Sequence, residues 1–183
     1  MKNVYEECPI YKKKMITLSQ TNTDDAEELL KCYSDEKAVP FFNSDNCEGD
    51  DFYYTTIERM EKAIDFWDFS YKSRYFVRWT VVLNDTKEKI GTIEMFHRCT
   101  EDEFNHYGML RIDLQSKHEV QSIIGEILEI ANENFFEAFE VEAILTKAVP
   151  EDKQRISSLA QNGYKPLGKK LMSYGDYYVN KYK

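Results

Sequence analysis

The sequence has no apolar run near the roughly 20 residues that a membrane-spanning helix needs. Its first nine residues mix Lys2 with Glu6 and Glu7 and lack an apolar core, so we expect no signal peptide. It also lacks repeats, low-complexity tracts and linkers rich in proline or glycine, and its 183 residues include only 4 Pro and 7 Gly. We therefore predict a single domain over residues 1–183 with one substantial core.

Cysteine is scarce and scattered. The 4 cysteines, Cys8, Cys32, Cys47 and Cys99, include no CxxC pair. The cysteines lack the spacing of a disulfide framework and the sequence lacks an export signal, so we predict reduced thiols in a cytoplasmic protein. Only His97 lies near a cysteine, and no histidine has metal-ligand spacing with one, so we predict no metal site.

A basic surface is absent as well, because the formal net charge is -9. This disfavours nonspecific binding to nucleic acid. The excess of negative charge lies between residues 21 and 66, which include 13 acidic and 4 basic residues, while the other 137 residues carry 20 of each sign. Two interpretations remain open: solvated helix faces, or an acidic rim that steers a cationic partner toward the protein.

The periodicity of the apolar residues predicts a mixed α/β chain. The predicted strands are Met15–Leu18, Phe76–Leu83, Lys89–His97 with a possible bulge at Gly91, His106–Leu114, Val141–Ala148, Tyr164–Met172 and Tyr177–Lys183. The predicted helices run from Thr21 or Thr23 to about Tyr33, from Tyr54 to Phe69, from Lys117 to Phe136, and between Pro150 and Gly163, with Val39–Asp51 irregular.

The last third of the chain carries the most specific features. A helix-closing segment runs from Ser158 to Tyr164, and a tyrosine-rich tail runs from Tyr174 to Tyr182. With the order strand, loop, long helix, strand, short helix, these segments resemble the GNAT superfamily of acetyl-CoA-dependent N-acetyltransferases. The tail resembles the branch that acetylates ribosomal-protein N-termini. The resemblance implies a splayed mixed sheet of six to seven strands flanked by about four helices.

The resemblance also implies where acetyl-CoA binds. In the family, the strand before the long helix leads into an Arg or Gln, two residues, a Gly, one residue, and a Gly or Ala, whose backbone N–H groups cradle the pyrophosphate. Here Glu119 takes the place of the Arg, so we expect weaker binding than in a glycine-loop relative. The implied cofactor-binding residues are Leu114, Gln115, Gln121, Ser122, Ile123, Ile124 and Gly125, with Asp152 in place of an Asn that bonds the pantetheine arm.

Arg155 falls near a family serine, where it either reaches a cofactor phosphate or is solvated. Direct acetyl transfer further needs a base for the amine and sometimes an acid for the thiolate. Glu94 is the candidate base unless it is a solvent-facing strand carboxylate, and Tyr174 is the candidate acid, with Tyr177 and Tyr178 as alternatives unless they are sheet aromatics.

The resulting prediction is acetyl-CoA-dependent N-acetylation of a primary amine on a peptide N-terminus or a small molecule, with an acceptor that is cationic overall. The alternative is a catalytically silent domain of the same fold that binds a ligand or a protein partner.

Overall fold

The computed structural model describes residues 3–43 and 51–182. Within them, eight strands form one sheet in the order β1-β2-β3-β4-β5-β6-β8-β7. The strands are β1 (Tyr11–Lys12), β2 (Ile16–Gln20), β3 (Val77–Leu83), β4 (Lys89–His97), β5 (Tyr107–Leu114), β6 (Ala143–Lys147), β7 (Lys165–Pro166) and β8 (Tyr177–Lys181). The helices are α1 (Ala26–Tyr33), α2 (Val39–Phe42), α3 (Ile57–Lys72), α4 (Gln121–Ala138) and α5 (Lys153–Gln161), with 3-10 turns η1 (Thr23–Asp25) and η2 (Ser116–His118).

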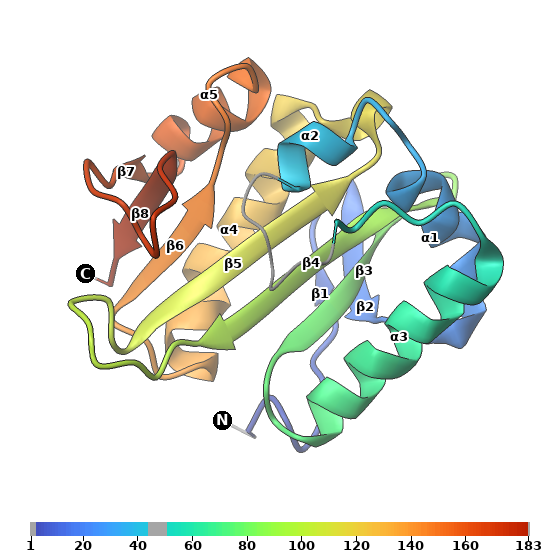
Figure 1. Cartoon of the computed structure of the whole chain (residues 1–183), viewed down its shortest axis with the longest axis horizontal. Helices are drawn as coiled ribbons and strands as arrows, with labels where there is room; N and C mark the ends of the chain where they lie inside the picture. The colour runs from blue at the N-terminus through green and yellow to red at the C-terminus, as the bar shows by residue number, and fades with distance from the viewer. Residues whose placement is uncertain (1–2, 44–50, 183) are drawn as a thin grey trace.

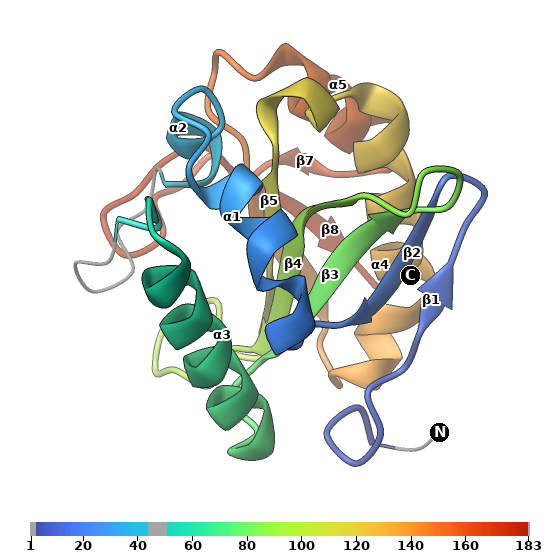
Figure 2. The same cartoon turned by 90° about the vertical axis from the view of Figure 1, so that its right-hand side faces the viewer.

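The sheet separates two helical layers (Figures 1 and 2). The long helix α4 covers one face, and its buried stripe packs on the inward side chains of the central strands, where Trp79 stacks on Phe135 with ring centroids 5.2 Å apart. Helices α1, α2 and α3 cover the other face, where Tyr33 and Trp67 lie in a second buried cluster. Among the described residues, no helix is long and apolar enough to cross a membrane.

Helix α4 confirms the predicted stripe, because Ile123, Ile124 and Ile127 are buried. Its start is later than predicted. The chain first forms η2, and Val120 is extended (φ -124°, ψ 147°), so the helix begins at Gln121 instead of Lys117. Gln121–Gly125 is therefore the opening turn of the helix, as the cofactor-site interpretation requires.

The bulge predicted at Gly91 is confirmed. Val81 pairs with Gly91 but Val82 pairs with Lys89, so Ile90 is the additional residue on β4. Gly91 has φ +154°, and a Cβ there would lie 2.0 Å from the carbonyl oxygen of Asp113. Only glycine allows β4 and β5 to approach this closely.

Other boundaries differ from the prediction. The strand expected over Tyr164–Met172 is reduced to β7, since Pro166 lacks an N–H for a ladder and Gly168 has φ +69°. Helix α2 lies within the segment expected to be irregular, and β1 was not predicted. These two elements account for eight strands and five α-helices where the resemblance implied six to seven strands and about four helices.

Strands β5 and β6 part at the centre of the sheet. They run parallel and pair from Tyr107 with Ala143 to Leu110 with Thr146. Beyond that point β5 continues to Leu114 on its pairing with β4, whereas β6 ends at Lys147. The splayed sheet is thereby confirmed, and the gap opens toward α2 and α5 (Figure 1).

Candidate active site

A cleft lies where β5 and β6 part. It is lined by Phe41 and Phe42 of α2, Glu94 and Phe96 of β4, Leu110, Arg111 and Ile112 of β5, Thr146 and Lys147 of β6, Arg155 of α5, and Tyr177 of β8. The cleft therefore joins residues from six elements that are far apart in the sequence.

The edge of β5 offers backbone groups to this gap. The carbonyl of Tyr107 accepts from Arg98, and the N–H of Gln115, directly after β5, donates to Ile90, so the backbone groups of these two residues face β4. Because backbone groups alternate in direction along a strand, those of Ile112 and Leu114 face the β6 side. The β6 ladder stops at Leu110, so the N–H and C=O groups of Ile112 and Leu114 have no ladder partner there.

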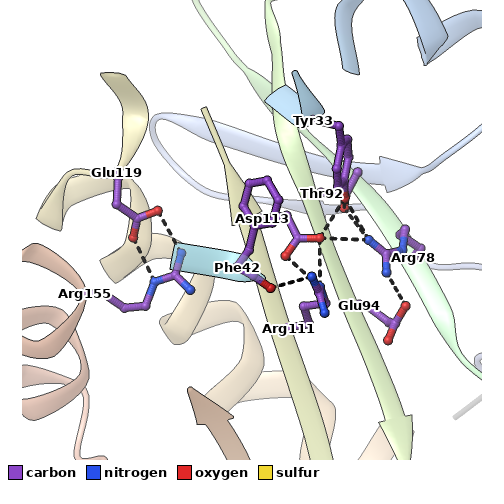
Figure 3. Close-up of polar contacts among 9 residues, drawn as sticks. All are labelled: Tyr33, Phe42, Arg78, Thr92, Glu94, Arg111, Asp113, Glu119 and Arg155. Atoms are coloured by element: carbon purple, nitrogen blue, oxygen red, sulfur yellow. Dashed lines mark hydrogen bonds and ion pairs between the residues drawn. The ribbon is translucent and has the colours of Figure 1, made fainter. Parts of the chain in front are cut away.

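Glu94 lies in the cleft and is not a solvated strand carboxylate. Its side chain is 13% exposed and forms an ion pair with Arg78, which is its direct neighbour on β3 (Figure 3). Arg78 is itself buried, with its guanidinium 4.1 Å from the ring centroid of Trp67. A buried arginine of this kind fixes the position of the carboxylate that it contacts.

Arg78 belongs to a buried polar network beneath α1 (Figure 3). Its Nη1 donates to the hydroxyl groups of Tyr33 and Thr92, each at 2.9 Å, and lies 3.2 Å from Asp113. Tyr33 donates to the same Asp113 oxygen over 2.8 Å. The guanidinium therefore lies between two carboxylates, Glu94 and Asp113, which compensate its burial.

Arg111 connects the network to the helix over the cleft. Its Nε donates to Asp113 over 2.8 Å, and its Nη2 donates to the carbonyl of Phe42 at the end of α2. Its guanidinium also lies 3.9 Å from the ring centroid of Phe52. One strand residue thus fixes the position of α2, whose Phe41 and Phe42 form a wall of the cleft.

A second buried ion pair lies at the other end of the cleft. Arg155 donates from Nε and Nη2 to the two carboxylate oxygens of Glu119, each over 2.8 Å (Figure 3). Asp152 caps α5 by accepting the N–H of Arg155, and its Oδ2 lies 3.3 Å from Arg155 Nε. Burial raises the pKa of Glu119 against the opposing effect of Arg155, and Asp152 raises it further. Arg155 is therefore not solvated.

The family model of the acetyltransferase (GNAT) domain matches residues 16–165 of this chain. The protein belongs to the GNAT acetyltransferase family. A relative from Bacillus subtilis (strain 168), named as the uncharacterized N-acetyltransferase YoaA, is 29% identical over 93 residues. That alignment covers 51% of this chain and 48% of the relative, so the chain matches about half of the relative's length.

Solved GNAT structures share the fold. The ribosomal-protein-S5-alanine acetyltransferase from Vibrio fischeri superposes with a TM-score of 0.73 at 15% identity, covering 94% of this chain and 96% of that one. The Salmonella typhimurium acetyltransferase that modifies the N-terminal serine of ribosomal protein L7/L12 gives 0.70 at 14% identity, covering 96% and 100%. RimL, a ribosomal L7/L12 acetyltransferase solved with coenzyme A, gives 0.67 at 14% identity, covering 94% and 98%. The recognised branch is thus represented among the structural neighbours.

The first turn of α4 is where GNAT enzymes bind pyrophosphate. Several of its backbone N–H groups here donate hydrogen bonds to acceptors within the chain. The N–H of Gln121 donates to the side-chain oxygen of Gln154 over 3.1 Å, and the N–H groups of Ile123 and Ile124 donate to Val120. Ser122 is exposed. The side chains of Ile123 and Ile124 fill the core, so these two residues can bind a ligand only through their backbones.

Three further predicted cofactor residues are placed as follows. Gly125 is not required by packing, since a Cβ there would meet nothing within 4 Å. The side chain of Leu114 is buried against α4. Gln115 directs its side chain toward the carbonyl of Lys89, 3.5 Å away, and its N–H is bonded to β4. Leu114 therefore reaches the gap through its backbone, whereas Gln115 faces away from it.

Among the three tyrosines, only Tyr177 lines the cleft. Tyr174 lies in the turn before β8, bridged to Leu171, with Lys147 Nζ 5.0 Å from its ring centroid. Tyr178 is the next residue along β8, so its side chain points to the other face of the strand. Its burial raises its pKa, with a further contribution from Asp176.

The described residues of the cleft fit the pantetheine arm of acetyl-CoA. The hydroxyl oxygen of Thr146 is buried in the cleft wall and has no hydrogen-bond partner in residues 3–43 and 51–182. It lies beside the unpaired backbone edge of β5, so the gap offers both donors and acceptors to an amide-bearing chain. Arg155 adds a cation to the same wall, as an anionic cofactor needs.

The sequence analysis did not predict the residues that hold the Glu94 carboxylate in position. Arg78, Arg111 and Asp113 occupy alternating positions of strands that were predicted correctly, and charged residues at such positions are uncommon inside a sheet. That pattern was the available signal. The contacts of Tyr33 and of α2 depend on the packing of helices on the sheet and left no local signal.

Proposed function

We propose that this GNAT protein transfers an acetyl group from acetyl-CoA directly to a primary amine, on a peptide N-terminus or a small molecule. The observation that carries the proposal is the cleft between β5 and β6. Among its described lining residues, Glu94 is the one carboxylate, and it lies with the rings of Phe41, Phe42, Phe96 and Tyr177. Aromatic rings and a carboxylate together attract an ammonium group and allow its deprotonation.

Each residue then has a defined role. Glu94, held by Arg78, accepts the proton of the amine. The N–H groups of Ile112 and Leu114 and the hydroxyl of Thr146 hold carbonyl and amide groups of the cofactor arm, and acetyl-CoA, when bound, supplies the acetyl group as a thioester. Tyr177 replaces Tyr174 as the candidate acid, because Tyr177 lines the cleft.

The acceptor we propose is cationic overall. This follows from the acidic segment between residues 21 and 66, because α1, α2 and most of α3 belong to it and cover one face of the sheet (Figure 2). Glu94 lies on that face, since its partner Arg78 contacts Tyr33 of α1 and Trp67 of α3. Within the described residues Cys8, Cys32 and Cys99 are free thiols, which agrees with the cytoplasmic location that we propose.

The test is release of the CoA thiol from acetyl-CoA in the presence of a panel of peptides and small amines. We expect turnover with basic acceptors, and a decrease in kcat of about 100-fold or more for Glu94→Gln, the typical effect of losing a general base. Glu142→Gln removes an exposed carboxylate and serves as the control. Full activity of Glu94→Gln would contradict the assignment of the base.

The Glu119–Arg155 pair supports a second candidate, a catalytically silent GNAT domain. An arginine that is held by two carboxylates is less available to a cofactor phosphate. Isothermal titration of acetyl-CoA and CoA into the protein separates the candidates. Binding of acetyl-CoA without turnover of any amine, or no binding of either at millimolar concentration, favours the silent domain.

A further inference from the structure

Two of the positions at which the chain departs from the GNAT cofactor pattern contact each other. Glu119 stands where the family has an Arg or Gln, and Arg155 stands near a family serine. The two residues are 36 positions apart, yet they form a bidentate pair with both distances at 2.8 Å. Position 119 thus carries no cation in this chain, but the residue that it contacts, Arg155 on α5, is a cation.

This pair is buried between the first turn of α4 and α5. The side chains of Arg155 and Glu119 are 3% and 4% exposed. Arg155 nevertheless lines the cleft, whereas Glu119 is not among the lining residues. Its Nη1 makes no hydrogen bond within residues 3–43 and 51–182.

The charges around Arg155 do not balance. Glu119 and Asp152 both approach the one guanidinium, and Asp152 Oδ2 is buried without a hydrogen-bond partner among the described residues. A guanidinium binds a carboxylate and a phosphate with the same planar fork of donors. The Glu119 carboxylate therefore occupies two donors, Nε and Nη2, that a phosphate would require.

Side chains of α5 also engage the first turn of α4. Gln154 accepts the N–H of Gln121 over 3.1 Å, and the hydroxyl of Ser158 donates to the carbonyl of Gln121 over 3.1 Å. A free N–H at a helix start is a donor that a phosphate can use. The guanidinium of Arg155 and the N–H of Gln121 thus both donate to acceptors within the chain, Glu119 and Gln154.

We propose that Glu119 is an internal competitor for the diphosphate of acetyl-CoA: its carboxylate holds Arg155 until the diphosphate takes its place. This inference rests on the proposed function, since it requires the cofactor. It assigns Arg155 on α5 as the phosphate-binding cation. It also makes position 119 a determinant of cofactor affinity, through competition for one guanidinium.

The test is isothermal titration of two ligands into the full-length protein: CoA, and pantetheine, which lacks the diphosphate. Glu119→Gln should bind CoA at least about fivefold more tightly than wild type, the low end of typical coupling between two ligands. Pantetheine affinity should not change. Glu151→Gln, an exposed carboxylate one residue before Asp152, removes the same charge nearby and should leave both affinities as in wild type.

A double variant tests the role of Arg155. Removing Arg155 alone would leave two buried carboxylates without a cation and threaten folding, so Arg155→Gln is combined with Glu119→Gln. We expect the double variant to lose the tighter CoA binding of Glu119→Gln. Thermal unfolding checks that each variant is folded.

Distinct outcomes overturn the distinct proposals. If wild type and Glu119→Gln bind CoA equally, or if the double variant binds as tightly as Glu119→Gln, Glu119 does not compete for Arg155, although acetyl-CoA remains the cofactor. Equal tightening for CoA and pantetheine would show a steric effect and also overturn the competition. If no variant binds CoA, the proposed function itself is overturned.

Discussion

The carboxylate of Asp35 accepts the backbone N–H of Ser116 over 2.8 Å, and so joins the segment between α1 and α2 to the loop between β5 and α4. Its other oxygen accepts the N–H of Lys37 over 3.0 Å. Burial opposes ionisation of Asp35, but the hydrogen bonds from Ser116, Lys37 and Ala38 outweigh it and lower its pKa. The ionised carboxylate therefore stabilises the contact between the α1–α2 segment and the loop that precedes α4.

We expect Asp35→Asn to lower the free energy of unfolding at pH 7 by about 1–3 kcal/mol. An asparagine side chain has only one acceptor oxygen, so the backbone N–H of either Ser116 or Lys37 loses its partner. The pKa of Asp35 is lowered in the folded state. Its stabilisation is thus fully present above the ordinary value of 3.8 and is lost as the pH falls through the folded pKa. Urea unfolding between pH 7 and 3 measures this.

The control is Asp65→Asn, an exposed aspartate on α3. It should change the unfolding free energy by less than about 0.5 kcal/mol at either pH. A difference between wild type and Asp35→Asn that persists unchanged to pH 3 would mean that the carboxylate charge is not the source.

Two ion pairs of different burial predict different costs. Arg78→Met leaves Glu94 and Asp113 without their shared cation and should destabilise the protein by about 3–5 kcal/mol. Lys72→Met removes an exposed pair with Asp68 one helical turn away and should cost less than about 1 kcal/mol. Denaturant unfolding of both variants at pH 7 compares them. Equal costs would show that the network beneath α1 does not depend on Arg78.

The sequence predicted elements whose pattern is local. The hairpin strand Lys89–His97 is found with its predicted bounds, because turn residues and β-branched residues mark it. Helix α2 was not predictable in this way. Its four residues include Pro40 and two phenylalanines, and its position depends on Arg111, 69 positions away from Phe42.

The site was predictable to a similar extent. Glu94 could be proposed from its strand and the family order, but its pairing with Arg78 follows from strand register, which the spacing of the hairpin only suggests. The Glu119–Arg155 pair depends on how α4 packs on α5. Before the structure, its members appeared as two unrelated departures from the family pattern.

Two glycines should respond oppositely to alanine. Gly91→Ala would place a Cβ 2.0 Å from a backbone oxygen at φ +154°, so we expect a loss of at least about 3 kcal/mol or failure to fold. Gly125→Ala lies in α4 with open space around the Cβ and should stabilise the protein by up to about 1 kcal/mol. Thermal unfolding distinguishes them. A tolerated Gly91→Ala would refute the close approach of β4 and β5.

If the acidic segment steers a cationic acceptor, its effect is on encounter and not on chemistry. Electrostatic steering raises association rates and is screened by salt. We expect kcat/KM for a basic peptide to fall several-fold between about 0.02 and 0.3 M salt, while kcat barely changes. Neutralising Asp45, Glu48, Asp50 and Asp51 together should mimic high salt, although the first three lie outside the described residues.

The negative charge of this segment suits steering and not the role of the base. An amine must lose a proton before it attacks, and nearby carboxylates favour its charged form. Glu94 is held in the cleft by Arg78, whereas Asp51 is exposed. A control protein in which four acids of the turns before β5 and β6 are neutralised (Glu101, Glu103, Glu140 and Glu142) should keep the salt response of wild type. If neutral and acidic amines are acetylated as well as basic peptides, with no effect of salt, the acidic segment is a solvated face and the acceptor is selected within the cleft alone.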